Sequence, residues 1–252
     1  MILSICIDSI FEGMNSIEAL QQVKAAGFNA FEFWHWKERD LGALAKKAES
    51  LELSCSGFCT SPFNLTDPSQ RDVFLQGLKE SIAQTKKIGA RFLITQSGSD
   101  TGESRSFQKQ SIIDGLKAAA PLLEGAGVTL LLEPLNWKID HPGIYLEYSD
   151  EGFEILNAVG SPCVKLLFDI YHQQITEGDI IRRISSHINE IGHIHCAGNP
   201  GRHELDTGEL DYRRIFKAIE DAGYKGRVGI EYFPVVNPLA GLKRLQELIS
   251  HS

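Results

Sequence analysis

The chain has 252 residues, of which 42% are hydrophobic and 23% are charged, an ordinary composition for a globular protein with a sizeable core. Its formal net charge of -8 argues against a nucleic-acid partner, because such a partner is bound mainly by neutralising its phosphates. No apolar run is long enough to span a membrane, and the first residues lack the basic and apolar regions of a secretory signal. We therefore expect no nucleic-acid partner and no membrane partner.

The chain contains five cysteines, an odd number, and none of them forms a CxxC pair. In a chain of this length that pattern is typical of reduced thiols, so we expect a cytoplasmic protein. Cys196 directly follows His195. Because adjacent strand residues point to opposite faces, we do not expect Cys196 to share a ligand set with that histidine.

Short β-rich runs alternate with segments of helical spacing along the chain. Strands are predicted at residues 2–7, 28–34, 52–57, 91–95, 128–133, 163–169, 191–196 and 227–232. Apolar stripes with helical spacing occur at residues 17–26, 41–51, 73–88, 112–123, 153–159 and 215–222. Most of these stripes are followed by a glycine, the residue type expected where a helix ends; after 112–123 the candidates are Gly125 and Gly127.

This alternation predicts eight strand-plus-helix units and hence a single (β/α)8 TIM barrel domain over residues 1–252. The alternative is a doubly wound open sheet, which would normally carry a glycine-rich phosphate loop after its first strand. Residues 6–13 contain no GxGxxG pattern. The GSDTG segment at residues 98–102 follows the fourth strand and lacks P-loop spacing, so we favour the barrel.

Four of the late strands end on residue types that bind metal ions, namely Glu133, Asp169, His195 and Glu231. A single acid in such a place could begin a loop or cap a helix, but four successive strand ends are harder to explain in that way. Barrel strands are buried on both faces, and their C-terminal ends build the active site, so we expect the four side chains to converge. Three oxygen donors and one nitrogen donor suit Mn2+ or Mg2+, with Co2+ tolerated.

A divalent cation that held a carbonyl and its neighbouring hydroxyl would lower the cost of forming an enediolate. Glu133 and Glu231 lie three strands apart, on opposite sides of the expected cation. One carboxylate would remove a proton from carbon and the other would return it. The pattern therefore predicts an isomerase of a small hydroxycarbonyl compound.

Four further residues are candidates for substrate binding. His172, after the sixth strand, and His141, after the fifth, are expected to touch the substrate. Arg202, in the loop after the seventh strand, would hold a carboxylate or a hydroxyl, although it could also be a solvated loop residue. Trp34 is expected to form a wall of the pocket.

Two inward-facing residues have weaker claims to a role. Glu32 shares a strand face with Trp34 and is expected to support the metal ligands from behind. His193 lies one layer deeper than His195, where an interior histidine with satisfied hydrogen bonds is the more common occurrence.

Several segments carry a family resemblance, namely LLEPLN (131–136), DHPGIYL (140–146), VKLLFDIYHQQITEGD (164–179), GHIHCAGNPGRHELDTGELDY (192–212) and VGIEYFP (228–234). In these segments the chain resembles the hydroxypyruvate isomerase family, within the xylose-isomerase-like TIM barrels. The resemblance implies a divalent metal and the interconversion of hydroxypyruvate and tartronate semialdehyde. It also implies that Glu133 and Glu231 form the acid–base pair and that Asp169 is a metal ligand. Dimers or tetramers are what the superfamily resemblance suggests.

His195 departs from the bacterial hydroxypyruvate isomerases, which look to carry Gln at that place, and is similar to the ketose 3-epimerases. The alternative function is therefore a ketose 3-epimerase acting on a free keto sugar such as tagatose or psicose. A metal nuclease of the endonuclease IV type would want extra histidines, and the third strand end, CSGFCT, has none. A non-catalytic sugar-binding role on the same barrel is the remaining alternative.

Overall fold

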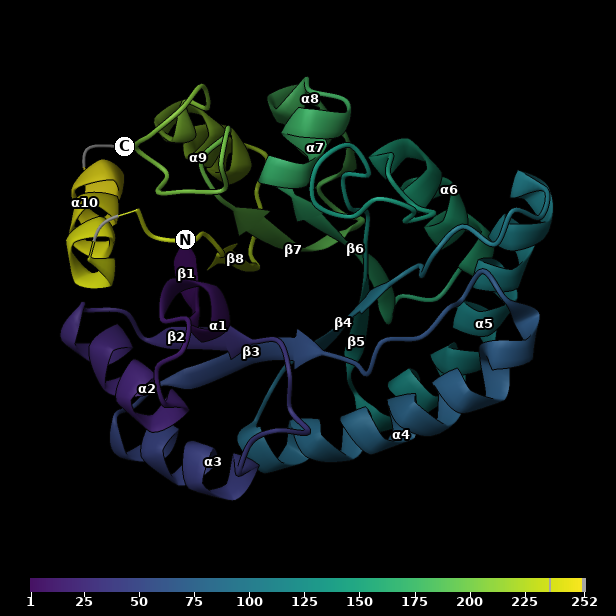
Figure 1. Cartoon of the computed structure of the whole chain (residues 1–252), viewed down its shortest axis with the longest axis horizontal. Coiled ribbons are helices and arrows are strands. Elements are labelled where there is room, and N and C mark those ends of the chain that lie inside the picture. Colours follow the sequence, from purple (N-terminus) through teal and green to yellow (C-terminus); the bar gives the residue numbers. More distant parts are fainter. Residues whose placement is uncertain (236, 251–252) are drawn as a thin grey trace.

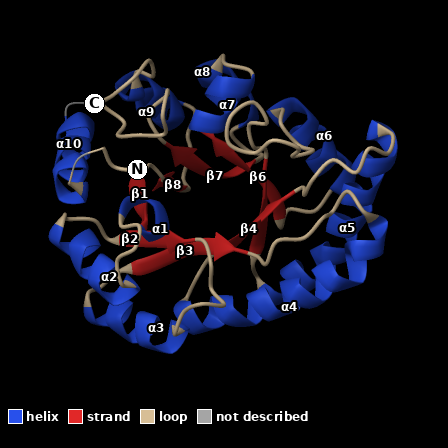
Figure 2. Cartoon of the chain, viewed as in Figure 1, coloured by secondary structure: helices blue, strands red, loops and turns tan. Residues whose placement is uncertain are grey.

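Eight parallel strands close into a barrel in sequence order, and helices surround them (Figures 1 and 2). The computed structural model describes residues 1–235 and 237–250. The strands are β1 (Ile2–Cys6), β2 (Ala30–Phe33), β3 (Ser54–Cys59), β4 (Phe92–Gln96), β5 (Thr129–Glu133), β6 (Val164–Asp169), β7 (Ile191–Cys196) and β8 (Arg227–Ile230). The predicted (β/α)8 barrel is confirmed, and each strand lies within two residues of its predicted bounds.

The helices form the outer layer (Figure 2). They are α1 (Ile7–Ile10), α2 (Ser16–Ala25), α3 (Leu41–Ser50), α4 (Arg71–Ile88, after a 3-10 turn at Pro68–Gln70), α5 (Arg105–Ala126), α6 (Ser149–Val159), α7 (Ile170–Thr176), α8 (Ile180–His187), α9 (Tyr212–Asp221) and α10 (Pro238–Ser250). The six predicted stripes correspond to α2, α3, α4, α5, α6 and α9. Of the two candidate glycines after residues 112–123, Gly127, in the left-handed conformation at φ 66°, is the one that ends α5.

Four helices were not predicted from the sequence. Of these, α1 and α7 are short and follow β1 and β6 without a loop. The side chain of Asp169 accepts hydrogen bonds from the backbone N–H groups of Tyr171 and His172, so one carboxylate both ends the strand and caps α7. No described helix is both long and apolar enough to cross a membrane.

Alternation along β5 separates two apolar layers. Leu130 and Leu132 are fully buried in the large cluster that joins the barrel to the helices. Leu131 belongs instead to a small cluster with Phe92, Ile94 and Leu167. Because side chains alternate along a strand, Glu133 lies on the same face as Leu131. The strand pattern thus directs an acid into the end of the barrel.

Leu132→Ala should lower the free energy of unfolding by about 2–5 kcal/mol, because it leaves a cavity between β5 and the helices. Chemical denaturation followed by circular dichroism measures the change. The control is Val73→Ala on α4, where the side chain is 55% exposed and the expected loss is about 0.5 kcal/mol or less. Equal losses in the two variants would contradict the layered core.

Candidate active site

The four predicted ligands converge at the C-terminal end of the barrel. Asp169 and His195 are register partners on β6 and β7, and Glu133 is the last residue of β5. Glu231 directly follows β8, and its backbone N–H donates to the carbonyl of Cys196 at 3.0 Å. All four side chains are buried, and one ligand atom from each lies within 4.8 Å of the others. The cluster could therefore hold a metal ion.

His195 is the centre of this cluster. Its Nδ1 lies 3.1 Å from Glu231 Oε2 and 3.6 Å from Glu133 Oε1, yet neither ring nitrogen makes a hydrogen bond. Burial alone would lower the pKa of His195, but the carboxylates of Glu231 and Glu32 raise it above its ordinary value. A buried imidazole that faces carboxylates without a hydrogen-bond partner fits the environment of a metal ligand.

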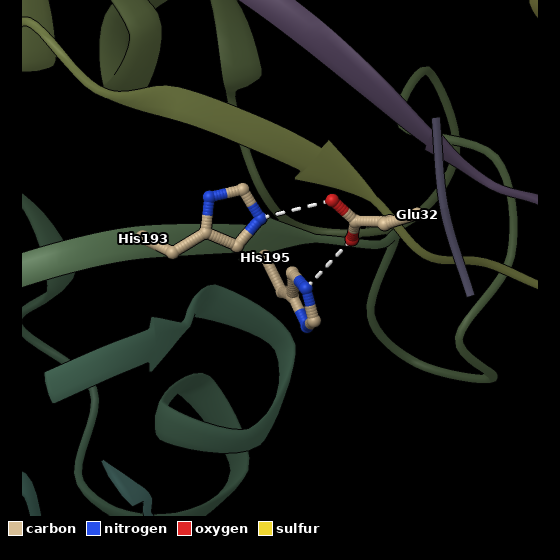
Figure 3. Close-up of side chains that lie close together, drawn as sticks. All are labelled: Glu32, His193 and His195. Atoms are coloured by element: carbon tan, nitrogen blue, oxygen red, sulfur yellow. Dashed lines mark hydrogen bonds and ion pairs between the residues drawn. The ribbon is translucent and has the colours of Figure 1, made fainter. Parts of the chain in front are cut away.

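Glu32 contacts both histidines of β7, with one carboxylate oxygen facing each ring (Figure 3). Its Oε2 accepts a hydrogen bond from His193 Nε2 at 3.1 Å, and its Oε1 lies 2.8 Å from His195 Nε2 as an ion-pair contact. Burial raises the pKa of Glu32, but the two histidines outweigh this and bring it down to about 2. Gly229 on β8 makes room for this group, because a Cβ there would meet Glu32 Oε1 at 2.4 Å.

Arg202 reaches the same cluster from the loop between β7 and α9. Its Nη2 donates to Glu231 Oε2 at 2.6 Å and lies 3.5 Å from Asp169 Oδ2. Burial would lower the pKa of Arg202, but the two carboxylates raise it. The pKa of Glu231 falls well below its usual range, because Arg202 and His195 outweigh burial, whereas burial still raises that of Asp169. Arg202 is thus held against two predicted metal ligands.

The balance of charge supports a cation at this place. Four carboxylates are buried together, namely Glu32, Glu133, Asp169 and Glu231. The groups that face them are the guanidinium of Arg202 and the imidazoles of His193 and His195. Unpaired buried charges are costly, and a divalent cation would offset them better than one guanidinium. The donor set therefore fits a divalent metal.

The cluster lies in the wall of a pocket of about 570 Å³. Three of the predicted substrate contacts, His141, His172 and Arg202, contribute to its polar lining. Trp34 also lines the pocket, among apolar side chains such as Phe63 and Phe233, and its Nε1 donates to Glu231 Oε1. The structure thus brings these four residues to the same cavity as Glu133, His195 and Glu231. Asp169 is not among the residues that line the pocket, although it lies within the cluster.

The tautomer of His172 follows from its neighbours. Asn136 Nδ2 donates to His172 Nδ1 at 2.6 Å, so the proton of the neutral ring is on Nε2. That nitrogen lies 3.6 Å from Asp169 Oδ2 and has no hydrogen bond. Burial and the nearby Arg202 lower the pKa of His172 to about 3, so the ring is neutral at physiological pH and can donate.

Two polar residues of the site were missed by the sequence analysis. Gln96 ends β4 and donates to Glu133 Oε2 at 3.3 Å, and Asp140 accepts from Asn136 at 2.6 Å. The rule that found the four ligands would also have found Gln96, because it stands at a strand end. The predicted strand stopped one residue earlier, at position 95. Cys196 packs into the outer apolar cluster, on the opposite side from His195.

The buried neutral His172 should make stability depend on pH. The unfolded chain binds a proton on this ring below about pH 6.5, whereas the folded ring stays neutral down to about pH 3. The free energy of unfolding should therefore fall as pH decreases from about 6.5 towards 4, with up to about 1.4 kcal/mol per pH unit due to His172. Denaturation of the wild type and of His172→Gln over this range measures the difference in slope.

The matched control is His35→Gln, because that imidazole is exposed. Its stability should follow the slope of the wild type. If His172→Gln also followed that slope, the buried ring would not be the source of the pH dependence.

Comparisons with known proteins agree with this geometry. A family model described as xylose isomerase-like TIM barrel matches residues 20–250. The 2-oxo-tetronate isomerase of Cupriavidus necator is 42% identical over 138 residues, which are 55% of this chain and 53% of that protein. The match thus spans about half the length of that relative. The hydroxypyruvate isomerase of Escherichia coli is 32% identical over 177 residues, 70% of this chain and 68% of that protein.

Solved structures share the barrel. A crystal structure described as AP endonuclease, family 2, from Brucella melitensis has a TM-score of 0.94 and 27% identity, and the match covers 98% of both chains. An L-ribulose 3-epimerase has a TM-score of 0.84 and 24% identity over 99% of this chain and 93% of that chain, and shows the same fold. The chain belongs to the xylose isomerase-like TIM barrel family, and it is an enzyme of the isomerase type.

Proposed function

We propose that this enzyme is a metal-dependent isomerase that moves a proton between adjacent carbons of a small hydroxy keto acid, with hydroxypyruvate as its first candidate substrate. The observation that carries the proposal is the buried cluster of Glu133, Asp169, His195 and Glu231 beside Arg202 and the pocket. Relatives named hydroxypyruvate isomerase and 2-oxo-tetronate isomerase support a substrate that contains a carboxylate. The product from hydroxypyruvate would be tartronate semialdehyde.

The four cluster residues would hold the metal, with Mn2+ or Mg2+ favoured by three carboxylates and one imidazole. A bound divalent cation supplies Lewis-acid stabilisation of the negative charge that develops on the substrate oxygens. His195 would offer Nδ1, which faces Glu133 and Glu231, while its Nε2 faces Glu32. Glu32 thereby fixes the direction of the imidazole without touching the substrate.

The proton is moved by Glu133 and Glu231, whose carboxylates both face Nδ1 of His195, at 3.6 and 3.1 Å. One carboxylate takes the proton from the carbon that bears the hydroxyl, and the other delivers a proton to the former carbonyl carbon, while the hydroxyl proton moves to the former carbonyl oxygen. His172 donates from Nε2 to a substrate oxygen, because its Nδ1 is occupied by Asn136. Trp34, Phe63 and Phe233 form an apolar part of the pocket wall.

A ketose 3-epimerase is the second candidate. The observation that favours it is the size of the pocket, about 570 Å³, which has room for a chain longer than three carbons. A neutral keto sugar such as tagatose or psicose would place its hydroxyls against Asp140, His141 and His172 rather than a carboxylate against Arg202. The two candidates therefore differ in what they require of Arg202.

We do not propose a nuclease, despite the description of the Brucella structure. Within residues 1–235 and 237–250, two clusters of side chains could hold a metal ion, and both clusters include His195. The end of β3 offers Cys59 and Thr60 to the pocket, not a histidine. The net charge of -8 also disfavours a polyanionic substrate.

The function is tested by proton exchange observed with NMR in D2O. The protein is incubated with hydroxypyruvate, with other small keto acids and with tagatose or psicose, in the presence of Mn2+, Mg2+ or Co2+. Deuterium at the hydroxyl-bearing carbon of hydroxypyruvate, together with formation of tartronate semialdehyde, is the expected result. Exchange only at carbon 3 of the keto sugars would favour the epimerase, and no exchange with any of them would argue for a non-catalytic role.

Glu133→Gln and Glu231→Gln should each lower kcat by about 10²- to 10⁴-fold, because each removes a proton carrier. The control is Glu103→Gln, an exposed residue whose loss should leave kcat unchanged. Since both glutamates also belong to the metal cluster, Mn2+ affinity is measured for each variant by calorimetry. Turnover close to that of the wild type in both variants would refute the acid–base assignment.

Arg202→Met should reduce kcat/KM for hydroxypyruvate by about 10- to 100-fold, the size expected for a charge-assisted contact to a carboxylate. Any loss for a neutral ketose should be clearly smaller. Steady-state kinetics with both substrates give the ratio, and Arg213→Met on the surface serves as the control for loss of one charge. Equal losses for the acid and the ketose would show that Arg202 does not read the substrate carboxylate.

A further inference from the structure

A second pocket, of about 470 Å³, lies at the opposite end of the barrel from the active site. Its wall is built from residues within one position of the start of six strands, namely Ile2, Arg91, Thr129, Lys165, Ile191 and Arg227. The four active-site ligands stand instead at the strand ends. This second pocket, which we call the base pocket, is therefore separate from the site of the proposed isomerase reaction.

The base pocket is strongly cationic. Arg91, Lys165, Lys225 and Arg227 line it, and no carboxylate does. In the part of the chain that the structure describes, none of these four side chains forms an ion pair with an acid. Four cations without an acidic partner line one pocket of a protein whose net charge is -8.

The acids that flank the base pocket already have other partners. Glu190 Oε2 lies 2.6 Å from His187 Nδ1. Glu220 Oε1 lies 3.6 Å from the terminal amine of Met1. Neither carboxylate is paired with one of the four cations that line the base pocket.

Two of the four cations are held in place by neutral partners. Lys165 Nζ donates to the carbonyl of Asn189 at 2.7 Å. The guanidinium of Arg227 donates to Ser56 Oγ at 3.0 Å and Ser54 Oγ at 2.8 Å. Burial and the like charge of Arg91 lower the pKa of Arg227. A bound anion would offset both the burial of this guanidinium and its repulsion by Arg91. A fixed guanidinium needs little ordering when it binds an oxyanion.

The inner wall of the base pocket is apolar and open. Phe92 and Leu131, from the cluster inside the barrel, line it together with Gly192. A Cβ at position 192 would meet Leu131 Cδ2 at 2.5 Å, so glycine keeps this wall free of a side chain. The hydroxyl of Tyr224 donates to the carbonyl of Arg227 at 3.0 Å and thus fixes the rim. An apolar wall below a cationic rim suits an organic body that carries a charged group.

We propose that the base pocket binds a small phosphate ester. Its phosphate would be held by Arg91, Lys225 and Arg227, since guanidinium groups match phosphate geometry and a dianion balances several cations better than one carboxylate would. The carbon chain of the ester would lie against Phe92 and Leu131. The volume of the base pocket is within the range of small-molecule sites, about 300–1,000 Å³.

The test is calorimetric titration of the full chain with glycerol 3-phosphate, inorganic phosphate and succinate. Wild-type protein should bind glycerol 3-phosphate at one saturable site, more tightly than the other two anions. The double variant Arg91→Gln, Lys225→Gln changes two exposed side chains and should weaken binding about tenfold or more. The matched double variant Arg213→Gln, Lys117→Gln removes the same charge elsewhere and should bind as the wild type does.

Arg202→Met locates the bound anion, because Arg202 is the cation of the active-site pocket. Unchanged binding in this variant supports the base pocket, and loss of binding would move the anion to the active site and overturn the proposal. No saturable binding by the wild type, or equal weakening by the two double variants, would also overturn it. If succinate bound more tightly than glycerol 3-phosphate, the pocket would not be selective for phosphate. If inorganic phosphate bound as tightly as glycerol 3-phosphate, the pocket would not recognise the carbon chain of an ester.

Discussion

The burial of excess negative charge at one end of the barrel is the constraint on which the site depends. Four carboxylates lie there, and the side chains of Glu32, Asp169 and Glu231 are each 5% exposed or less. Strand alternation places them inward, so the fold cannot turn them to water without giving up the apolar layers below. The cost is offset locally by Arg202, which contacts Asp169 and Glu231, and by the two histidines of β7, which both contact Glu32.

The group formed by His193, Glu32 and His195 shows how the barrel fixes the orientation of one imidazole ring (Figure 3). His193 packs on Phe92 with ring centroids 4.5 Å apart, so it rests on the apolar interior of the barrel. It donates to Glu32, which in turn faces His195. The direction in which His195 points its Nδ1 is thus set by contacts that begin in the apolar core. The glycine at position 229 is needed for the same reason, because any side chain there would displace the carboxylate.

Much of the fold could be predicted, because most strands are short apolar runs and α4, α5 and α6 each end at a glycine. The helix α10 carried a visible apolar stripe, at Leu242, Leu245 and Leu248, that the sequence analysis did not use. The convergence of Glu133 with Glu231 follows from barrel closure, which brings strands distant in sequence to one rim. The ion pairs of Arg202 could not be foreseen, because they depend on a loop in which that residue has φ 56°.

Under the proposed function, Arg202 couples the charge of the substrate to the strength of the base. While its guanidinium contacts Glu231, the pKa of that carboxyl stays low and its oxygens are weak proton acceptors. A substrate carboxylate that engages Arg202 shares this positive charge, so the pKa of Glu231 rises and the carboxylate becomes a better base. A neutral ketose leaves the contact intact. Arg202 would then favour acidic substrates in two ways. It would bind their carboxylate, and by doing so it would make Glu231 a stronger base.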